Sequence, residues 1–118
     1  MMARGYGSMG QGKAFQCEIT VSSGVREKLL GKHHVEIWEI EEIIYDDPRA
    51  FSITHRDCYF IYGRTFAGRY LLALVRILSP HEAMAIGLQP SSHVLRVITA
   101  RDMNQTQRGM YHRRGGKP

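Results

Sequence analysis

The spacing of hydrophobic residues changes along this chain and divides it into strand-like and helix-like segments. Residues 15–21 alternate apolar and polar side chains, which is the period of a strand with one buried face. The period then becomes helical, because Val25 and Leu29 are four positions apart and the isoleucines of residues 36–45 form one stripe. We therefore expect a short helix that ends at Gly31 and a second helix over residues 36–45.

Strand-like segments dominate the second half of the chain. Four strands are expected, at residues 50–54, 58–65, 69–78 and 93–100. The third is apolar on both faces, which predicts a central position in a sheet. Residues 66–68 are expected to form the tight hairpin loop that precedes it.

Helix-start signals predict two further helices. Ser79 and Glu82 have the spacing of a capping box, which predicts a short helix inserted before the last strand. Asn104 and Gln107 have the same spacing, which predicts a C-terminal helix over residues 105–113. Two helices followed by an antiparallel meander are typical of an α+β domain whose helices pack on one face of a sheet.

Length and cysteine content restrict the class of protein. With 118 residues the chain has the size of one domain. No apolar run approaches the roughly 20 residues that span a bilayer. Two cysteines, Cys17 and Cys58, do not make a disulfide framework, which is typical of a reducing cytoplasm. We expect a flexible leader over residues 1–13, one domain over residues 14–114 and a frayed tail over residues 115–118.

Charge is distributed unevenly within a net charge of +5. Residues 14–47 carry three basic and eight acidic side chains, whereas residues 48–118 carry eleven basic and three acidic ones. Ten of these eleven are arginines, whose guanidinium groups bind phosphate bidentately and stay charged at any working pH. Such a surface is typical of nucleic-acid-binding proteins, although a solvated basic face without a partner has the same composition.

Two of these arginines are expected to face each other across neighbouring strands. If Leu78 lies opposite Val94, then Arg76 lies opposite Arg96 on one face of the sheet. Like charges in that arrangement are destabilising unless an anion or a carboxylate lies between them. One interpretation is a phosphate-binding face. The other is that the arginines reach solvent or pair with carboxylates, namely Glu39, Glu41, Glu42, Asp46, Asp47 or Asp57.

The sequence carries none of the common motifs of nucleotide-binding or hydrolytic enzymes. It has no glycine-rich phosphate loop, no GxSxG elbow and no CxxC pair. None of its six histidines forms an HxxxH or HxH pair, so neither a metal site nor a cofactor is expected.

An ordered set of short motifs resembles the BrnT-type toxins. That family begins with K-H-G-V, E-E-V and D-P patterns, continues with a G-R-T hairpin and a strand that ends in S/T-A-R, and finishes with an E-R-x-x-Y helix. The similar segments here are residues 32–35, 40–43, 46–49, 62–72 and 97–103, followed by Arg108 and Tyr111. This chain departs from the pattern at His34, Glu36 and Gln107, and residues 80–92 lengthen a connection that is usually short.

The resemblance implies a fold and an activity. BrnT-type toxins are small cytoplasmic ribonucleases that cleave RNA without a metal and are silenced by a DNA-binding antitoxin encoded beside them. The implied fold is a RelE-like α+β fold, in which two N-terminal helices and a C-terminal helix pack on an antiparallel β-sheet. The implied partners are RNA and a cognate antitoxin, with DNA reached only through the antitoxin, and neither a membrane nor a cofactor is involved.

The resemblance, together with the expected pairing of Arg76 and Arg96, suggests roles for eight residues. Arg64 and Arg101 would stabilise charge at the reacting phosphate. His33 would act as acid or base, or would instead be a connector histidine that satisfies backbone carbonyls, and Thr99 would orient the substrate. RNA phosphates would be held by Lys32, Arg69, Arg76 and Arg96.

A non-catalytic module on the same fold, which binds RNA or a protein, is the alternative interpretation. The helix expected over residues 36–45 is acidic and the strands are basic, so the domain would offer two surfaces of opposite charge. Direct DNA binding is a third interpretation. The C-terminal helix is the candidate recognition helix for it, because this helix carries Arg108, Arg113 and Arg114.

Overall fold

A computed structural model of the protein describes residues 17–89 and 93–115. The elements along the chain are β1 (Cys17–Thr20), α2 (Ser23–Lys28), α3 (Ile37–Glu41), β2 (Phe51–His55), β3 (Cys58–Arg64), β4 (Tyr70–Ile77), α4 (Pro80–Ala85), β5 (His93–Asp102) and α5 (Gln105–Met110). Three of the helices continue directly into a π-helical turn: α2 into Leu29–His33, α3 into Glu42–Asp46 and α5 into Tyr111–Gly115. The predicted order of strands and helices is confirmed, and the leader expected over residues 1–13 lies outside the described residues.

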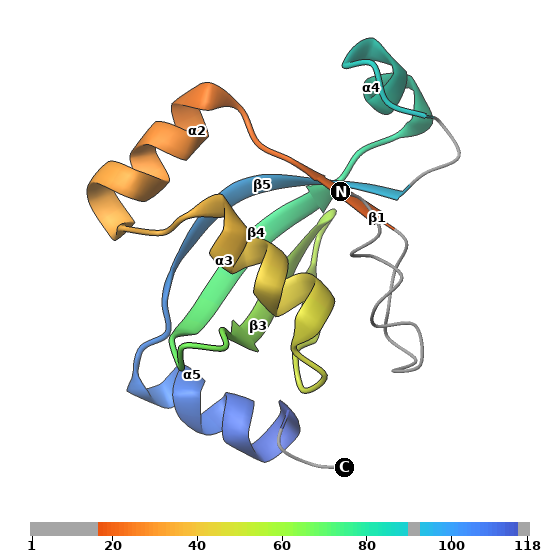
Figure 1. Ribbon diagram of the computed structural model, residues 1–118. Coiled ribbons are helices and arrows are strands. Elements are labelled where there is room, and N and C mark those ends of the chain that lie inside the picture. The colour runs from red at the N-terminus through yellow and green to blue at the C-terminus, as the bar shows by residue number, and fades with distance from the viewer. Residues whose placement is uncertain (1–16, 90–92, 116–118) are drawn as a thin grey trace.

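The strands of the described chain form one five-stranded sheet in the order β1-β5-β4-β3-β2 (Figure 1). Strand β4 is central, as its apolar sequence predicts. Strands β2 to β5 pair in antiparallel fashion, but β1 pairs with β5 in parallel, with Cys17 beside His93. The expectation of a purely antiparallel sheet is therefore wrong for β1, because hydrophobic period identifies a strand but not its direction.

Helices α2 and α3 cover one face of the sheet, which we call the inner face (Figure 1). Its centre is formed by Leu71, Ala73 and Val75 of β4, all fully buried. Ile40 and Ile43 of the α3 segment pack into the same core, as the predicted isoleucine stripe requires.

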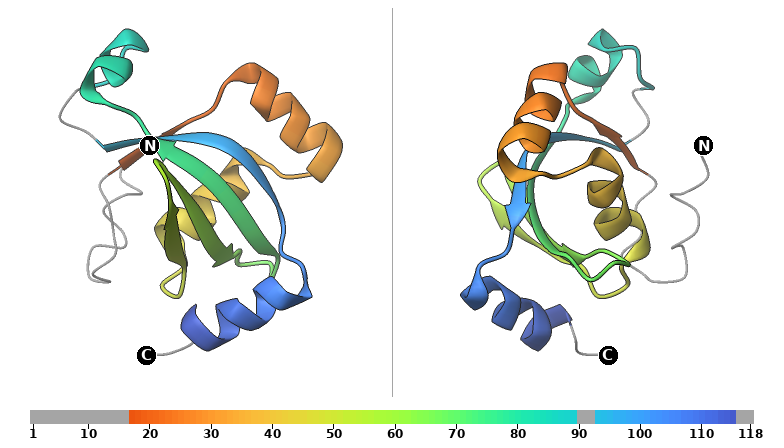
Figure 2. Two further views of the ribbon diagram at one scale, coloured as in Figure 1. Left: turned by 180° about the vertical axis from the view of Figure 1, so that it is seen from behind. Right: turned by 60° about the vertical axis from the view of Figure 1, so that its left-hand side comes forward.

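The opposite, outer face is covered at both ends rather than in the middle. Side chains alternate along β4, so Tyr70, Leu72, Leu74 and Arg76 point to this face. Tyr111, which follows α5, packs there against Tyr62 and Leu72, so α3 and α5 lie on opposite sides of the strands (Figure 2, right). At the other end, Ala83 of α4 packs on Leu78 and Val94. The expectation that all helices share one face thus holds for α2 and α3 only.

Helix caps follow the sequence signals closely. Ser22, Ser79 and Asn104 each accept a hydrogen bond from a backbone N–H at the start of α2, α4 and α5. The first helix does not end at Gly31 but continues to His33, and His34 adopts the left-handed conformation at φ 56°. No helix in the described ranges is long and apolar enough to cross a membrane.

Candidate functional site

Five of the predicted site residues lie on the outer face of the sheet. Thr99 and Arg101 of β5 pair with Leu74 and Leu72, and Arg64 of β3 pairs with Tyr70. These partners point outward from the central strand, so the three side chains share their face. The fourth pair of positions, Arg76 opposite Arg96, confirms the register expected from the sequence.

A β-bulge explains how β5 keeps Arg96 and Arg101 on one face. The two residues are five positions apart, and in a regular strand an odd separation places side chains on opposite faces. The register shifts between Leu74 and Val75, which pair with Thr99 and Val97, so Ile98 is an extra residue. This extra residue shifts the alternation of side chains by one position, so Arg96 and Arg101 both point to the outer face.

Arg76 has a carboxylate partner that the sequence did not suggest. Its two terminal nitrogens donate to the two carboxylate oxygens of Glu82 in α4, at 3.2 and 3.0 Å. The side-chain hydrogen bond from Arg76 is the main cause that lowers the pKa of Glu82 to about 2, with the Ser79 N–H contributing. Within residues 17–89 and 93–115, the side chain of Arg96 makes no hydrogen bond or ion pair.

A cluster of cations surrounds Tyr70 at the α5 end of the outer face. The guanidinium carbons of Arg64 and Arg108 lie 5.2 and 4.9 Å from the centroid of the Tyr70 ring. The Tyr70 hydroxyl forms a 3.2 Å hydrogen bond with Nε2 of His112. Gly68 leaves space for Arg64, because a Cβ at this position would lie 3.3 Å from a terminal nitrogen of the Arg64 guanidinium. Gly68 also has a φ of 96°, which side chains rarely adopt.

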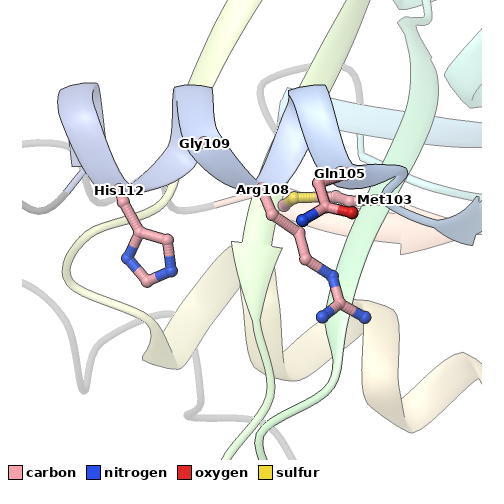
Figure 3. Close-up of a pocket in the computed structure, with 5 residues that line it drawn as sticks. All are labelled: Met103, Gln105, Arg108, Gly109 and His112. Atoms are coloured by element: carbon pink, nitrogen blue, oxygen red, sulfur yellow. The ribbon is translucent and has the colours of Figure 1, made fainter.

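An open pocket of about 640 Å³ lies beside this cluster. It is lined by Met103, Gln105, Arg108, Gly109 and His112. Arg108 and His112 are four residues apart, and both side chains project to the same side of α5 (Figure 3). A cation and a titratable imidazole therefore border one cavity at the edge of the outer face.

Asp47 holds the elements of this cluster together. Its buried carboxylate accepts hydrogen bonds from the Tyr111 hydroxyl and from the backbone N–H of Arg64, both at 2.8 Å. Burial, and next the hydrogen bond to Asp47, raise the pKa of Tyr111. The start of α5's extension and the end of β3 are thus fixed to one carboxylate. From the sequence, Asp47 was one of six carboxylates that could pair with the strand arginines.

Arg69 points to the inner face and uses all five of its N–H groups. They donate to both carboxylate oxygens of Asp102, to Glu39, and to the backbone carbonyls of His33 and His34, at 2.7 to 3.2 Å. Asp102 is the main cause that raises the pKa of Arg69. A guanidinium has no further donors, so this arrangement speaks against the phosphate-binding role expected for Arg69.

Lys32 and His33 lie apart from the outer-face arginines. Both belong to the π-helical turn after α2, on the side of the sheet that α2 covers. The His33 carbonyl accepts from Arg69 at 2.9 Å, and the charge of His33 contributes to lowering the pKa of Asp102, mainly lowered by Arg69. The structure therefore does not bring His33 to Arg64 and Arg101.

The sequence interpretation missed Tyr70 and His112 as site residues. In the sequence, Tyr70 is part of the similar segment 62–72 without a role of its own, and His112 matches no motif. One available signal was the four-residue spacing of Arg108 and His112, which places both on one helix face. In the described part of the chain, no group of three His, Cys, Asp or Glu side chains is placed to hold a metal ion.

The fold defined by these elements is a mixed α+β fold with helices on both sides of one sheet and an arginine-bearing outer face. No protein-family model matches the sequence, and no curated protein matches it either. The structure is similar to the 1.1 Å crystal structure of BrnT, a ribonuclease toxin of Brucella abortus, with a TM-score of 0.54 and 16% sequence identity. The match covers 75% of this chain and 99% of the Brucella chain. The resemblance to BrnT that the sequence motifs predict is thus confirmed at the level of the fold.

Proposed function

We propose that this protein is a BrnT-like toxin, a metal-independent endoribonuclease of a type II toxin–antitoxin system with a RelE-like arrangement of sheet and helices. The main support is the outer face, where Arg64 lies over the ring of the Tyr70–His112 pair and Arg101 and Thr99 follow on the same face, opposite Leu72 and Leu74 of β4. Its substrate would be RNA. A cognate antitoxin encoded nearby would bind the toxin and make the contact with DNA. A cytoplasmic location is part of the same proposal.

RNA cleavage of this kind proceeds by attack of the ribose 2′-oxygen on the adjacent phosphorus atom. A base takes the 2′ proton, cations stabilise the charge on the pentacoordinate phosphorane, and an acid protonates the 5′-oxygen as its bond to phosphorus breaks. We assign the charge stabilisation to Arg64 and Arg101, and the orientation of substrate to Thr99. The acid or base is assigned to His112 rather than His33, because His112 borders the arginine cluster.

The RNA path in this proposal follows the outer face from the Tyr70 cluster towards α4. Arg96 has no carboxylate partner in the described ranges and is available to a phosphate. Lys32 is exposed and remains a candidate at the periphery. Arg69 is assigned a positioning role, because its five donors are already used.

The direct test is incubation of the purified protein with single-stranded RNA of mixed sequence in EDTA. We expect cleavage with 2′,3′-cyclic phosphate ends, since the attacking oxygen belongs to the substrate. End groups are identified by mass spectrometry. Absence of cleavage by a protein whose circular dichroism shows an intact fold would contradict the endoribonuclease proposal.

Replacing His112 with asparagine should lower the cleavage rate by roughly 10²–10⁴-fold, the usual contribution of a general acid or base. Asparagine keeps a polar group near the Tyr70 hydroxyl but does not exchange protons at neutral pH. Single-turnover cleavage kinetics would measure the change. His33→Asn is the matched control and should retain most of the activity; a larger loss in that variant would return the acid–base role to His33.

Gln107 provides a test of the charge on Arg101. The Gln107 side-chain oxygen accepts from Arg101 at 3.1 Å, at the position where the family pattern has glutamate. A neutral amide orients the guanidinium without neutralising it. Gln107→Glu should therefore weaken RNA binding by about fivefold, the scale of one exposed ion pair, while preserving the capping of Asn104. Fluorescence anisotropy with labelled RNA measures the affinity, and unchanged binding would contradict a phosphate-facing role for Arg101.

A protein-binding module is the second candidate function, favoured by an exposed aromatic surface next to α3. Trp38 and Phe66 are 52% and 78% exposed. Glu42 lies between them, because it is four residues after Trp38 and accepts from the Phe66 N–H at 3.1 Å. Exposed aromatic side chains beside carboxylates are typical of a site for a protein with basic residues. In the toxin proposal this surface would serve the antitoxin; in the module proposal it would be the main function.

A further inference from the structure

At the α4 end of the outer face, two opposed arginines are accompanied by one carboxylate. Arg76 and Arg96 are directly paired across β4 and β5, and both side chains are half-buried. Opposed like charges destabilise a sheet. The Glu82 carboxylate compensates the charge of Arg76 through two hydrogen bonds, whereas Arg96 has no such partner among residues 17–89 and 93–115.

The way Glu82 binds Arg76 resembles the way a phosphate would bind it. A carboxylate and a phosphate both present two oxygens to the fork of a guanidinium, and Arg binds either one bidentately. Glu82 occupies both terminal nitrogens of Arg76, at 3.2 and 3.0 Å. A phosphodiester placed there would reach two opposed guanidinium groups instead of one.

Exchange of the two anions is favoured by the exposure of this ion pair. The side chains of Arg76 and Glu82 are 27% and 43% exposed, and ion pairs so open to water contribute little stability. Helix α4 does not depend on the pair either. Glu82 also accepts from the Ser79 N–H at 2.8 Å, Ser79 caps the helix in return, and Ala83 is buried beneath it.

We propose that Arg76 and Arg96 form a phosphodiester subsite for single-stranded RNA, in which Glu82 holds Arg76 until a phosphate displaces it. This inference rests on the proposed RNA-cleaving function and extends it to a second position on the outer face. Glu82 then acts as an internal competitor that limits affinity for RNA. The carboxylate comes from residues 80–92, the segment by which this chain departs from the BrnT pattern.

The test is a comparison of affinities for a 2′-O-methyl RNA oligonucleotide, which binds without being cleaved because its 2′-oxygen is blocked. We expect Glu82→Gln to bind up to about fivefold more tightly than the unsubstituted protein, the upper end of the range for an exposed ion pair. Glutamine preserves the hydrogen bond from Ser79. Glu27→Gln, at an exposed position of α2, changes the net charge equally and is the matched control; its affinity should change less than twofold.

Two double variants then show whether the gain uses the proposed subsite. Adding Arg76→Ala or Arg96→Ala to Glu82→Gln should abolish the gain, and circular dichroism would verify that each variant is folded. The subsite is overturned if Glu82→Gln binds no more tightly than Glu27→Gln, or if the gain survives both double variants. Binding by the unsubstituted protein without a gain would contradict this subsite alone, whereas absence of binding by every variant would contradict RNA as the ligand as well.

Discussion

Replacing Arg64 and Arg101 together with alanine should reduce RNA cleavage by roughly 10⁴-fold, because each cation that faces the developing charge typically contributes 10²–10³-fold. Arg64 is held over the Tyr70 ring, and Arg101 is held by Gln107 and by the backbone carbonyl of Asp102. Both guanidinium groups are thus oriented before substrate binds. The loss should appear in the rate of the chemical step, measured under single-turnover conditions with saturating protein.

Total charge must be separated from local geometry in this experiment. Arg26→Ala combined with Lys28→Ala removes the same two charges from α2, where both side chains are exposed. That control should lose only a small part of the cleavage rate. An equal loss in both double variants would mean that the net positive charge, rather than the outer face, supports activity. Thermal unfolding of each variant would verify that the comparison concerns folded protein.

Local sequence signals predicted much of this fold, because each acts over a few residues. Ser79 and Asn104 accept from backbone N–H groups three residues along the chain, as their capping-box spacing predicts. The pairing of Arg76 with Arg96 followed from matching two apolar strands. These features need no knowledge of distant parts of the chain.

Features that depend on contacts between distant segments were not predicted from the sequence. Strand β1 joins β5 in parallel across more than seventy residues of intervening chain, and the hydrophobic period of β1 is the same for either direction. The bulge at Ile98 adds a residue to β5 without a glycine or proline to mark it. Since the bulge decides that Arg96 and Arg101 share a face, the layout of the candidate site was not predictable from the period of the strand alone.

Candidate site residues divide in the same way. Arg64, Arg101 and Thr99 share the outer face, and their roles remain predictions. Arg69 looked equivalent in sequence, but its direction depends on the strand phase and its partners lie thirty or more residues away. His112 was missed because its significance comes from Tyr70, forty-two residues away in the chain.

Replacing Arg69 with methionine should destabilise the protein by about 1–3 kcal/mol, the usual cost of leaving buried hydrogen-bond acceptors without their donor. The change would leave the buried Glu39 carboxylate without its cation and the carbonyls of His33 and His34 without their donors. Equilibrium urea unfolding followed by circular dichroism measures this as a lower midpoint with a similar slope. Unfolding at the midpoint of the unsubstituted protein would contradict the structural role.

The ion pair between Arg69 and Asp102 should also make the stability of the protein depend on pH in the acid range. Arg69 is the main cause that lowers the pKa of Asp102 below its usual value. A carboxylate whose pKa is lower in the folded state adds stability above its unfolded pKa of about 4 and loses it as the pH falls towards the folded pKa. Below about pH 4 the unsubstituted protein should therefore lose this part of its stability, and Arg69→Met should show a weaker dependence over that range.

Arg69→Lys separates the structural role from a phosphate-binding one. Lysine keeps the positive charge but offers three donors from a single nitrogen, so it can pair with Asp102 without also reaching Glu39 and both carbonyls. Its stability should fall between those of the unsubstituted protein and Arg69→Met, and its RNA affinity should remain unchanged at temperatures where it is folded. If Arg69 instead held a phosphate, Arg69→Met would weaken RNA binding while leaving the urea midpoint in place. A lower urea midpoint with unchanged RNA affinity therefore indicates the structural role. Weaker RNA binding with an unchanged midpoint indicates the phosphate-binding role.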